Sequence, residues 1–184
     1  MDKSRLEIEK PMKILLAIDD SPYSEQVVET ILARHWPTSA EFKILVVLES
    51  MEGVKEEEHL AHALDSYAAA QEKRHHAAEH LADKVRKKMH AAIKGVSVHC
   101  LVKKGQPADE ILAVAHEWGA DTIILGAHGK DVCPHNLLGS VSHAVAKNAN
   151  CTVEIVRPEE HRLKVIGETR LAHASKQAHS GNKG

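Results

Sequence analysis

Five short apolar runs alternate with helical patterns along this chain, and that alternation restricts the fold more than any other feature. The runs are residues 12–19, 41–49, 96–102, 122–125 and 151–156. Residues 12–19 are almost continuously apolar, which is typical of a strand buried on both faces and hence of a parallel sheet. Strands that alternate with helices, joined by right-handed crossovers, predict an α/β fold with a doubly wound, five-stranded parallel sheet.

The segments between the runs carry helix signals. Ser21 is expected to cap the first helix, with Pro22 at its first position and Trp36-Pro37 at its end. From residue 59 to residue 94 there is no Pro or Gly, which predicts one long helix. A break near its middle stays open, because residues 71–76 carry almost no apolar side chain. Its inward positions are expected to be Leu60, Leu64, Tyr67, Ala78, Leu81, Val85 and Met89.

Two further expectations concern the third strand and the ends of the chain. The run at 96–102 is expected at a sheet edge, and residues 103–107 are expected to form a turn into a helix. Residues 12–158 are expected to form the domain. A polar lead-in at 1–11 precedes it, and a polar tail at 159–184 with a composition typical of disorder follows it.

Composition and charge narrow the class of protein. The 184 residues are 43% hydrophobic and 27% charged, which is ordinary for a soluble globular protein. A net charge of −2 and an aromatic content of 3% do not favour a nucleic-acid partner. No apolar run reaches about 18 residues, so no membrane span is predicted. The N-terminus lacks the apolar segment of a secretory signal, which favours a cytoplasmic protein.

Cysteine and histidine patterns do not predict a metal centre. The cysteines are Cys100, Cys133 and Cys151, without a Cys-x2-Cys pair, and are expected to be reduced cytosolic thiols. Cys133, in a loop, is the one for which oxidation is the alternative. The closely spaced histidines are His59 with His62, and His75 with His76 and His80. No cysteine or carboxylate completes an obvious tetrahedral set around them.

The stretch at 121–142 carries the main functional prediction. A buried strand ends at Gly126, and the spacing Gly126-x2-Gly129-x9-Gly139-Ser140 leads into a helix. Glycines let the backbone approach an anion, and the free N–H groups at a helix start point toward it. The pattern is neither a Walker A sequence nor a dinucleotide-binding Gly-x-Gly-x2-Gly. It therefore predicts an anion site, with a flexible loop before an ordinary helix start as the alternative.

Asp19 and His128 are the side chains expected beside that loop. Asp19 ends the first strand, where its carboxylate can accept from ribose hydroxyls or hold a cation; the alternative is that it helps to cap the next helix. If the first and fourth strands are neighbours, Asp19 and Gly126 face one crevice. His128 could be a general base or a phosphate donor, although a loop histidine without a carboxylate partner is more often solvent-exposed or phosphate-contacting. Lys130 adds a positive charge nearby.

Several of these segments together resemble the universal stress protein family. They are residues 12–21, 105–107, 120–126 and 151–157, with the glycine spacing of the family's nucleotide-binding branch. The resemblance covers residues 12–158. It implies a Rossmann-like fold of the adenine nucleotide alpha hydrolase type, with strand order 3-2-1-4-5. It also implies a homodimer paired through the fifth strand.

The resemblance further implies ATP in the crevice, although AMP or ADP would fit the same place, and Mg²⁺ could accompany the nucleotide. By position, the residues that would meet adenine and ribose are Ala17, Ile18, Asp19 and Val47. Those that would hold ribose and phosphates are Gly126, Gly129, Gly139, Ser140, Val141 and Ser142, with His128 close to them. Asp20 departs from the family's usual glycine, and Cys133-Pro134 stands where the family usually has Gly, Arg or Lys.

The function implied is an ATP-binding stress-response or signalling module that is dimeric and has little or no turnover. One alternative is a slow Mg²⁺-dependent ATPase, in which Asp19 holds the metal and His128 orients water. The other is a nucleotide-free scaffold that acts through the long helix and the tail. No residue is assigned as catalytic.

Overall fold

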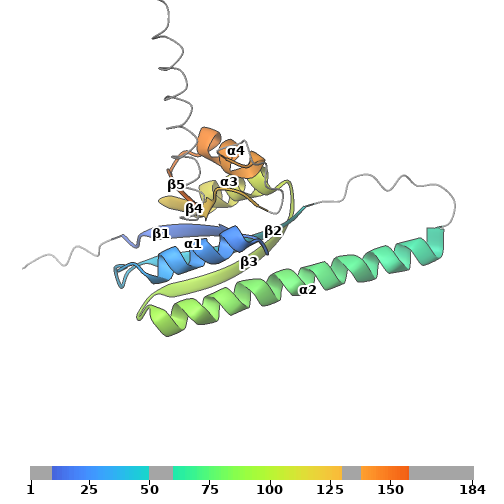
Figure 1. Cartoon of the computed structure of the whole chain (residues 1–184), viewed down its shortest axis with the longest axis horizontal. Coiled ribbons are helices and arrows are strands. Elements are labelled where there is room, and N and C mark those ends of the chain that lie inside the picture. Colours follow the sequence, from blue (N-terminus) through green and yellow to red (C-terminus); the bar gives the residue numbers. More distant parts are fainter. Residues whose placement is uncertain (1–9, 50–59, 130–137, 158–184) are drawn as a thin grey trace, which may run out of the picture.

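The chain folds around a parallel sheet of five strands (Figure 1). The structure is a computed structural model that describes residues 10–49, 60–129 and 138–157. The strands are β1 (Lys13–Ile18), β2 (Glu41–Glu49), β3 (Ser97–Gly105), β4 (Thr122–Gly126) and β5 (Thr152–Val156). Their order is β3-β2-β1-β4-β5 and all pairings are parallel, which confirms the predicted doubly wound α/β fold. The winding reverses between β1 and β4.

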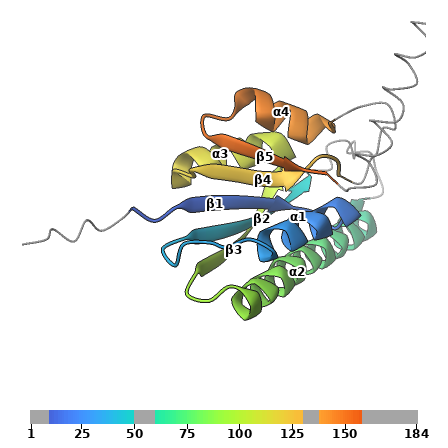
Figure 2. The ribbon, with the colours of Figure 1, turned by 60° about the vertical axis from the view of Figure 1, so that its left-hand side comes forward.

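The helices lie in two layers, one on each face of the sheet (Figure 2). They are α1 (Pro22–Leu32), α2 (Leu60–Ala92), α3 (Pro107–Trp118) and α4 (Ser140–Asn148). Alternate residues of β1 serve the two layers: Ile14 and Leu16 pack with α1 and α2, whereas Leu15 packs with α3 and α4. A strand covered on both faces needs apolar side chains at every position, which explains the unbroken apolar run.

The long helix is continuous, which confirms the prediction of one helix, and the break left open at residues 71–76 does not occur. Polar residues there do not stop the helix, because Gln, Glu, Lys and Arg are good helix formers. His75 and Glu79 also form a pair one turn apart, with 3.4 Å between Nε2 and Oε1. Tyr67, expected to face inward, is 38% exposed. Figure 1 shows the N-terminal end of α2 reaching past the strands, beyond the cover that the sheet provides.

Other element boundaries differ from expectation by a few residues. The helix α1 ends at Leu32 rather than at Trp36-Pro37, because Trp36 folds back to donate from Nε1 to the Ile31 carbonyl at 2.8 Å. Edge strand β3 includes Lys103 and Lys104, which were expected in a turn, because it pairs with β2 over the whole of that strand. Within the described residues, no helix is both long and apolar enough to cross a membrane.

Some sequence predictions fall outside the described residues. These are the lead-in up to residue 9, the tail at 159–184, His59, Lys130, Cys133 and Pro134, and the side chains of Leu60, His62 and Leu64.

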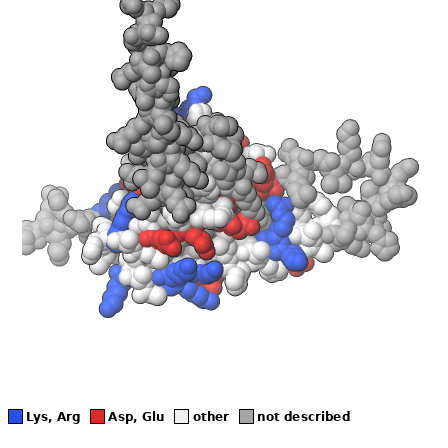
Figure 3. Space-filling view, in the orientation of Figure 1, with Lys and Arg blue, Asp and Glu red and all other residues white. Residues whose placement is uncertain are grey.

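On the face that α1 and α2 form, acidic and basic side chains lie interspersed, without one dominant positive patch (Figure 3).

Candidate functional site

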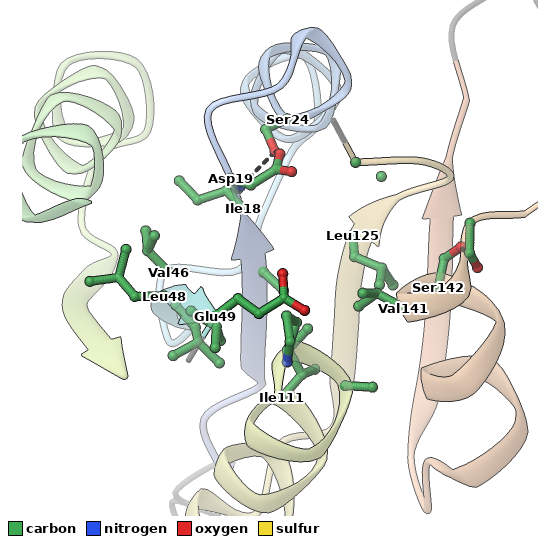
Figure 4. Close-up of a pocket in the computed structure, with 18 of the residues that line it drawn as sticks. Ile18, Asp19, Ser24, Val46, Leu48, Glu49, Ile111, Leu125, Val141 and Ser142 are labelled. Carbon is green, nitrogen blue, oxygen red and sulfur yellow. Dashed lines mark hydrogen bonds between the residues drawn. The ribbon is translucent and has the colours of Figure 1, made fainter. Parts of the chain in front are cut away.

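A cleft of about 680 Å³ opens at the carboxyl ends of β1, β2 and β4, where the winding of the sheet reverses (Figure 4). This is the position at which doubly wound sheets bind ligands, and the volume lies in the range of small-molecule sites. Every residue singled out in the sequence as a possible nucleotide contact lines it: Ala17, Ile18, Asp19, Val47, Gly126, His128, Gly129, Gly139, Ser140, Val141 and Ser142. The topology thus brings together segments that are distant in the chain.

The two carboxylate oxygens of Asp19 do different things. Oδ1 accepts hydrogen bonds from Ser21 Oγ at 2.5 Å, from the Ser21 N–H at 3.1 Å and from Ser24 Oγ at 2.6 Å. Ser21 does stand at the N-cap position of α1, but its hydroxyl bonds Asp19 and makes no side-chain cap, contrary to expectation. Oδ2 lies across from Gly129, where a Cβ would meet it at 3.0 Å. One oxygen therefore builds the turn into α1, and the other is directed to the Gly129 side of the cleft.

The glycines of the loop are required for space, since none of them has a positive φ. A Cβ on Gly126 would lie 3.1 Å from Tyr23 Cβ, and a Cβ on Gly139 would lie 3.3 Å from the Ala127 carbonyl oxygen. At Gly129 the Asp19 carboxylate is the nearby group. Gly126 and Gly139 thus allow the chain to pack against itself, whereas Gly129 keeps the cleft wide opposite Asp19.

The Ala127 carbonyl fixes the start of α4 beside the cleft. It accepts from the Gly139 N–H at 2.8 Å and from Ser142 Oγ at 2.7 Å. Ser142 is buried, so this hydroxyl is engaged within the protein. The first N–H groups of a helix have no partner inside it, and those of α4 begin at Ser140. The start of α4 is therefore held where its N–H groups can donate hydrogen bonds to an anion in the cleft.

His128 is buried at 3% exposure, and its ring lies 5.4 Å from that of Tyr23 on α1. Of the two environments expected for this histidine, solvent exposure is therefore wrong, and contact with a phosphate stays a prediction. The loop after β4 passes close to α1, as the tight approach of Gly126 to Tyr23 also shows. This packing encloses the imidazole at the edge of the cleft.

One wall of the cleft was not anticipated from the sequence. Arg74, Ala77, Ala78 and Leu81 line it from α2. The small apolar residues that recur at helical spacing after Arg74 are the one signal that marks this stretch as a packed face. Among the described lining residues, Arg74 is the one Lys or Arg, against the carboxylates of Asp19, Asp20, Glu49 and Asp109.

Metal ligation and thiol chemistry receive no support from the geometry of the described residues. No group of three or more His, Cys, Asp or Glu side chains in those ranges is placed to hold a metal ion. His75 and His76 lie beside Glu72 and Glu79 on the α2 surface. Burial raises the pKa of the Cys151 thiol, and it does the same for the pKa of Cys100, so both favour the neutral form.

The sequence of the chain is similar to a protein family and to individual proteins that bear the same family name. The profile of the universal stress protein family matches residues 11–157. A universal stress protein from Methanothermobacter thermautotrophicus is 45% identical over 62 residues, which are 34% of this chain and 42% of that protein. For three of the curated relatives that it resembles, the match covers 37–45% of their own length, which is less than half.

Solved structures share the fold over most of their length. That of MJ0577 from Methanocaldococcus jannaschii is similar with a TM-score of 0.69 and 26% identity, over 82% of this chain and 99% of that one. A family protein from Arabidopsis thaliana, solved with AMP bound, is similar with a TM-score of 0.58 and 18% identity, over 82% of this chain and 94% of that one.

Proposed function

Because this chain belongs to the universal stress protein family, we propose that its strand-end cleft binds an adenine nucleotide: ATP, or AMP or ADP in its place. The observation that carries the proposal is the convergence of the Asp19 carboxylate, the glycine loop and the start of α4 on one cleft. The carboxylate can accept hydrogen bonds from a ribose, and the backbone N–H groups can donate to a phosphate. The apolar walls can pack against a base. The relative from Arabidopsis thaliana with AMP bound supports the same choice of ligand.

In this assignment the nucleotide lies across the ends of the strands. Asp19 Oδ2 accepts from a ribose hydroxyl, and the N–H groups at Ser140 and Val141 hold phosphate beside Gly129. The adenine occupies the apolar end, near Ile18 and Val47. Mg²⁺ would enter with the polyphosphate. The unit that binds is residues 12–158, and the lead-in and the tail lie outside it.

We infer a binding role with little or no turnover in a cytoplasmic stress-response module. His128 is the one imidazole among the described lining residues, and it is enclosed against Tyr23. A general base must reach the water that it activates, and this ring is packed into the protein. Mg²⁺-dependent release of phosphate from ATP that disappears in His128→Ala would overturn this inference in favour of a slow ATPase.

The binding proposal is tested by isothermal titration of ATP and AMP into the protein and into Gly129→Val. The valine side chain would project toward Asp19 and narrow the cleft, so affinity should fall by at least about tenfold. Ala146→Val on the exposed surface of α4 is the control and should bind as the wild type does. Absence of binding at millimolar nucleotide, or equal affinity in Gly129→Val, would contradict the proposal.

A further inference from the structure

The cleft has a second polar feature, at the end of β2 and away from the glycine loop. Arg74 on α2 donates from Nη2 to the Glu49 carbonyl at 3.3 Å, which ties the long helix to the last residue of the strand. Its other terminal nitrogen, Nη1, is buried and has no hydrogen-bond partner in the described part of the chain. A buried guanidinium donor without a partner is costly, so the site favours an acceptor that a ligand brings.

Glu49 supplies the opposite kind of group next to it. Its side chain extends over the cleft (Figure 4), and the residue is exposed. Among the described residues, its carboxylate forms no ion pair with Arg74 or with any other cation. Within the described residues, a guanidinium nitrogen without a hydrogen-bond partner and a carboxylate without an ion pair thus both belong to residues that line this end of the cleft.

The surroundings of this pair suit a flat base. Leu48, Ala77 and Leu81 line the cleft next to Arg74 and Glu49. In the sheet order β3-β2-β1-β4-β5, β1 separates this end from Gly129 and the start of α4, where the proposed function places the phosphates. A nucleotide that extends from one end to the other therefore brings its base to Glu49 and Arg74.

Resting on the proposed function, we propose that Glu49 and Arg74 are the residues that read the base. Adenine carries an amine donor at C6 beside ring-nitrogen acceptors, whereas guanine and hypoxanthine carry a carbonyl oxygen at C6. The Glu49 carboxylate accepts from the amine, and Arg74 Nη1 donates to a ring nitrogen. A 6-oxo purine would place its oxygen against the Glu49 carboxylate, so the pair selects 6-aminopurine nucleotides.

The test compares AMP with inosine monophosphate, which differs in the C6 group, by isothermal titration into the full chain. The wild type should prefer AMP by at least about tenfold, the range expected for one hydrogen bond to a charged group. In Glu49→Gln this preference should collapse toward unity, because the amide can turn its N–H₂ toward a carbonyl.

Arg74 is tested with ligands that differ in phosphate content. Arg74→Ala should lower the affinities for adenosine and for AMP by the same factor of about ten, because the contact is made to the base that both ligands share. Lys73→Ala removes a neighbouring positive charge from α2 at an exposed residue outside the cleft, and it should change neither affinity. Thermal unfolding verifies that each variant is folded, and Arg74→Lys replaces Arg74→Ala if the alanine variant is not.

Three results would overturn the assignment. They are equal wild-type affinities for AMP and inosine monophosphate, an unchanged preference in Glu49→Gln, and a loss in the Arg74 variant that is larger for AMP than for adenosine. If the wild type binds none of these ligands, the proposed function fails together with the base-reading pair. If it binds AMP with any of the three results, only the base-reading pair fails.

Discussion

At the scale of single residues, Asp19 shows how one side chain can serve the fold and a ligand site together. The sequence allowed two roles for it, a ligand contact or support of the next helix. In the structure, Oδ1 accepts hydrogen bonds from Ser21 and Ser24 in the turn before α1, whereas Oδ2 points to the Gly129 side of the cleft. Substitutions at this residue can therefore separate stability from binding.

Asp19→Asn should lower the affinity for ATP while leaving the stability of the fold nearly unchanged. The amide oxygen can still accept from the two serines, so thermal stability should change little, whereas an N–H₂ group replaces the Oδ2 acceptor. ATP affinity should fall by about tenfold because a ribose hydroxyl loses its charged partner. Titration calorimetry and thermal unfolding measure the two effects. A variant that binds ATP as tightly as the wild type would remove Asp19 from the nucleotide contacts.

Asp19→Ala is the companion variant and should also be less stable. It leaves the hydroxyls of Ser21 and Ser24, both buried, without their acceptor. The expected loss in the free energy of unfolding is about 1–3 kcal/mol. Urea unfolding of the two variants side by side checks this, and equal stability of Asp19→Asn and Asp19→Ala would show that the turn does not depend on Oδ1.

At the scale of elements, Asp121 joins two strands at the amino-terminal end of the sheet. Its Oδ2 accepts from the Lys13 N–H of β1 at 2.8 Å, one residue before β4 begins. That hydrogen bond, with the Lys10 ammonium nearby, lowers the pKa of Asp121 below its ordinary value. The carboxylate form is therefore favoured in the folded state.

A pH dependence follows from this contact. Because the folded pKa lies below the unfolded one, the stabilisation is fully present above about pH 4 and is lost as the pH falls through the folded value. Asp121→Asn should lower the melting temperature at pH 7, and the difference from the wild type should shrink toward pH 3. Glu117→Gln at an exposed position is the control. A difference that is the same at both pH values would show that the charge is not involved.

The elements also show what the sequence could and could not predict. The strands were predictable because apolar residues at every position of a run require cover on both faces, as in β1. The long helix was predictable from the absence of Pro and Gly, whereas a break at residues 71–76 stayed open because that stretch carries almost no apolar side chain. The helix continues there because exposed polar residues are good helix formers. The approach of Arg74 to Glu49 was not predictable, because it depends on how α2 packs beside β2 and no local pattern encodes it.

The position of the glycine loop was predictable from the sequence, but the contacts that require glycine at each position were not. Its spacing led to the end of the sheet at which the cleft lies, and Gly126, Gly129 and Gly139 all line that cleft. The space that Gly126 leaves for Tyr23, and the burial of His128 that accompanies it, depend on α1 lying against the loop. Contacts between segments so distant in the chain have no signal in the sequence.

At the scale of the whole molecule, the sheet ends in two edges, β3 and β5. The resemblance to the family leads us to propose that β5 pairs with a second copy of the chain. The dimer should then sediment at twice the chain mass of 20.2 kDa. Thr152→Lys at this edge places a charged side chain in the proposed interface and should weaken the dimer by at least about tenfold.

Ser97→Lys is the matched variant at the opposite edge. Ser97 is exposed at the start of β3, as Thr152 is at the start of β5. It should leave the dimer intact in sedimentation equilibrium. A wild type that sediments as a monomer at micromolar concentration, or a Ser97→Lys variant that dissociates while Thr152→Lys does not, would contradict pairing through β5.

The Ala127 carbonyl accepts hydrogen bonds from both the Gly139 N–H and the Ser142 hydroxyl, and so joins the residues that precede and follow positions 130–137. Both ends of that segment are held by bonds that do not involve it. A change in the number of residues between 129 and 138 should therefore leave these two hydrogen bonds, and the cleft walls that they hold, in place. These two hydrogen bonds thus make the shape of the cleft independent of how many residues join Gly129 to Gly139.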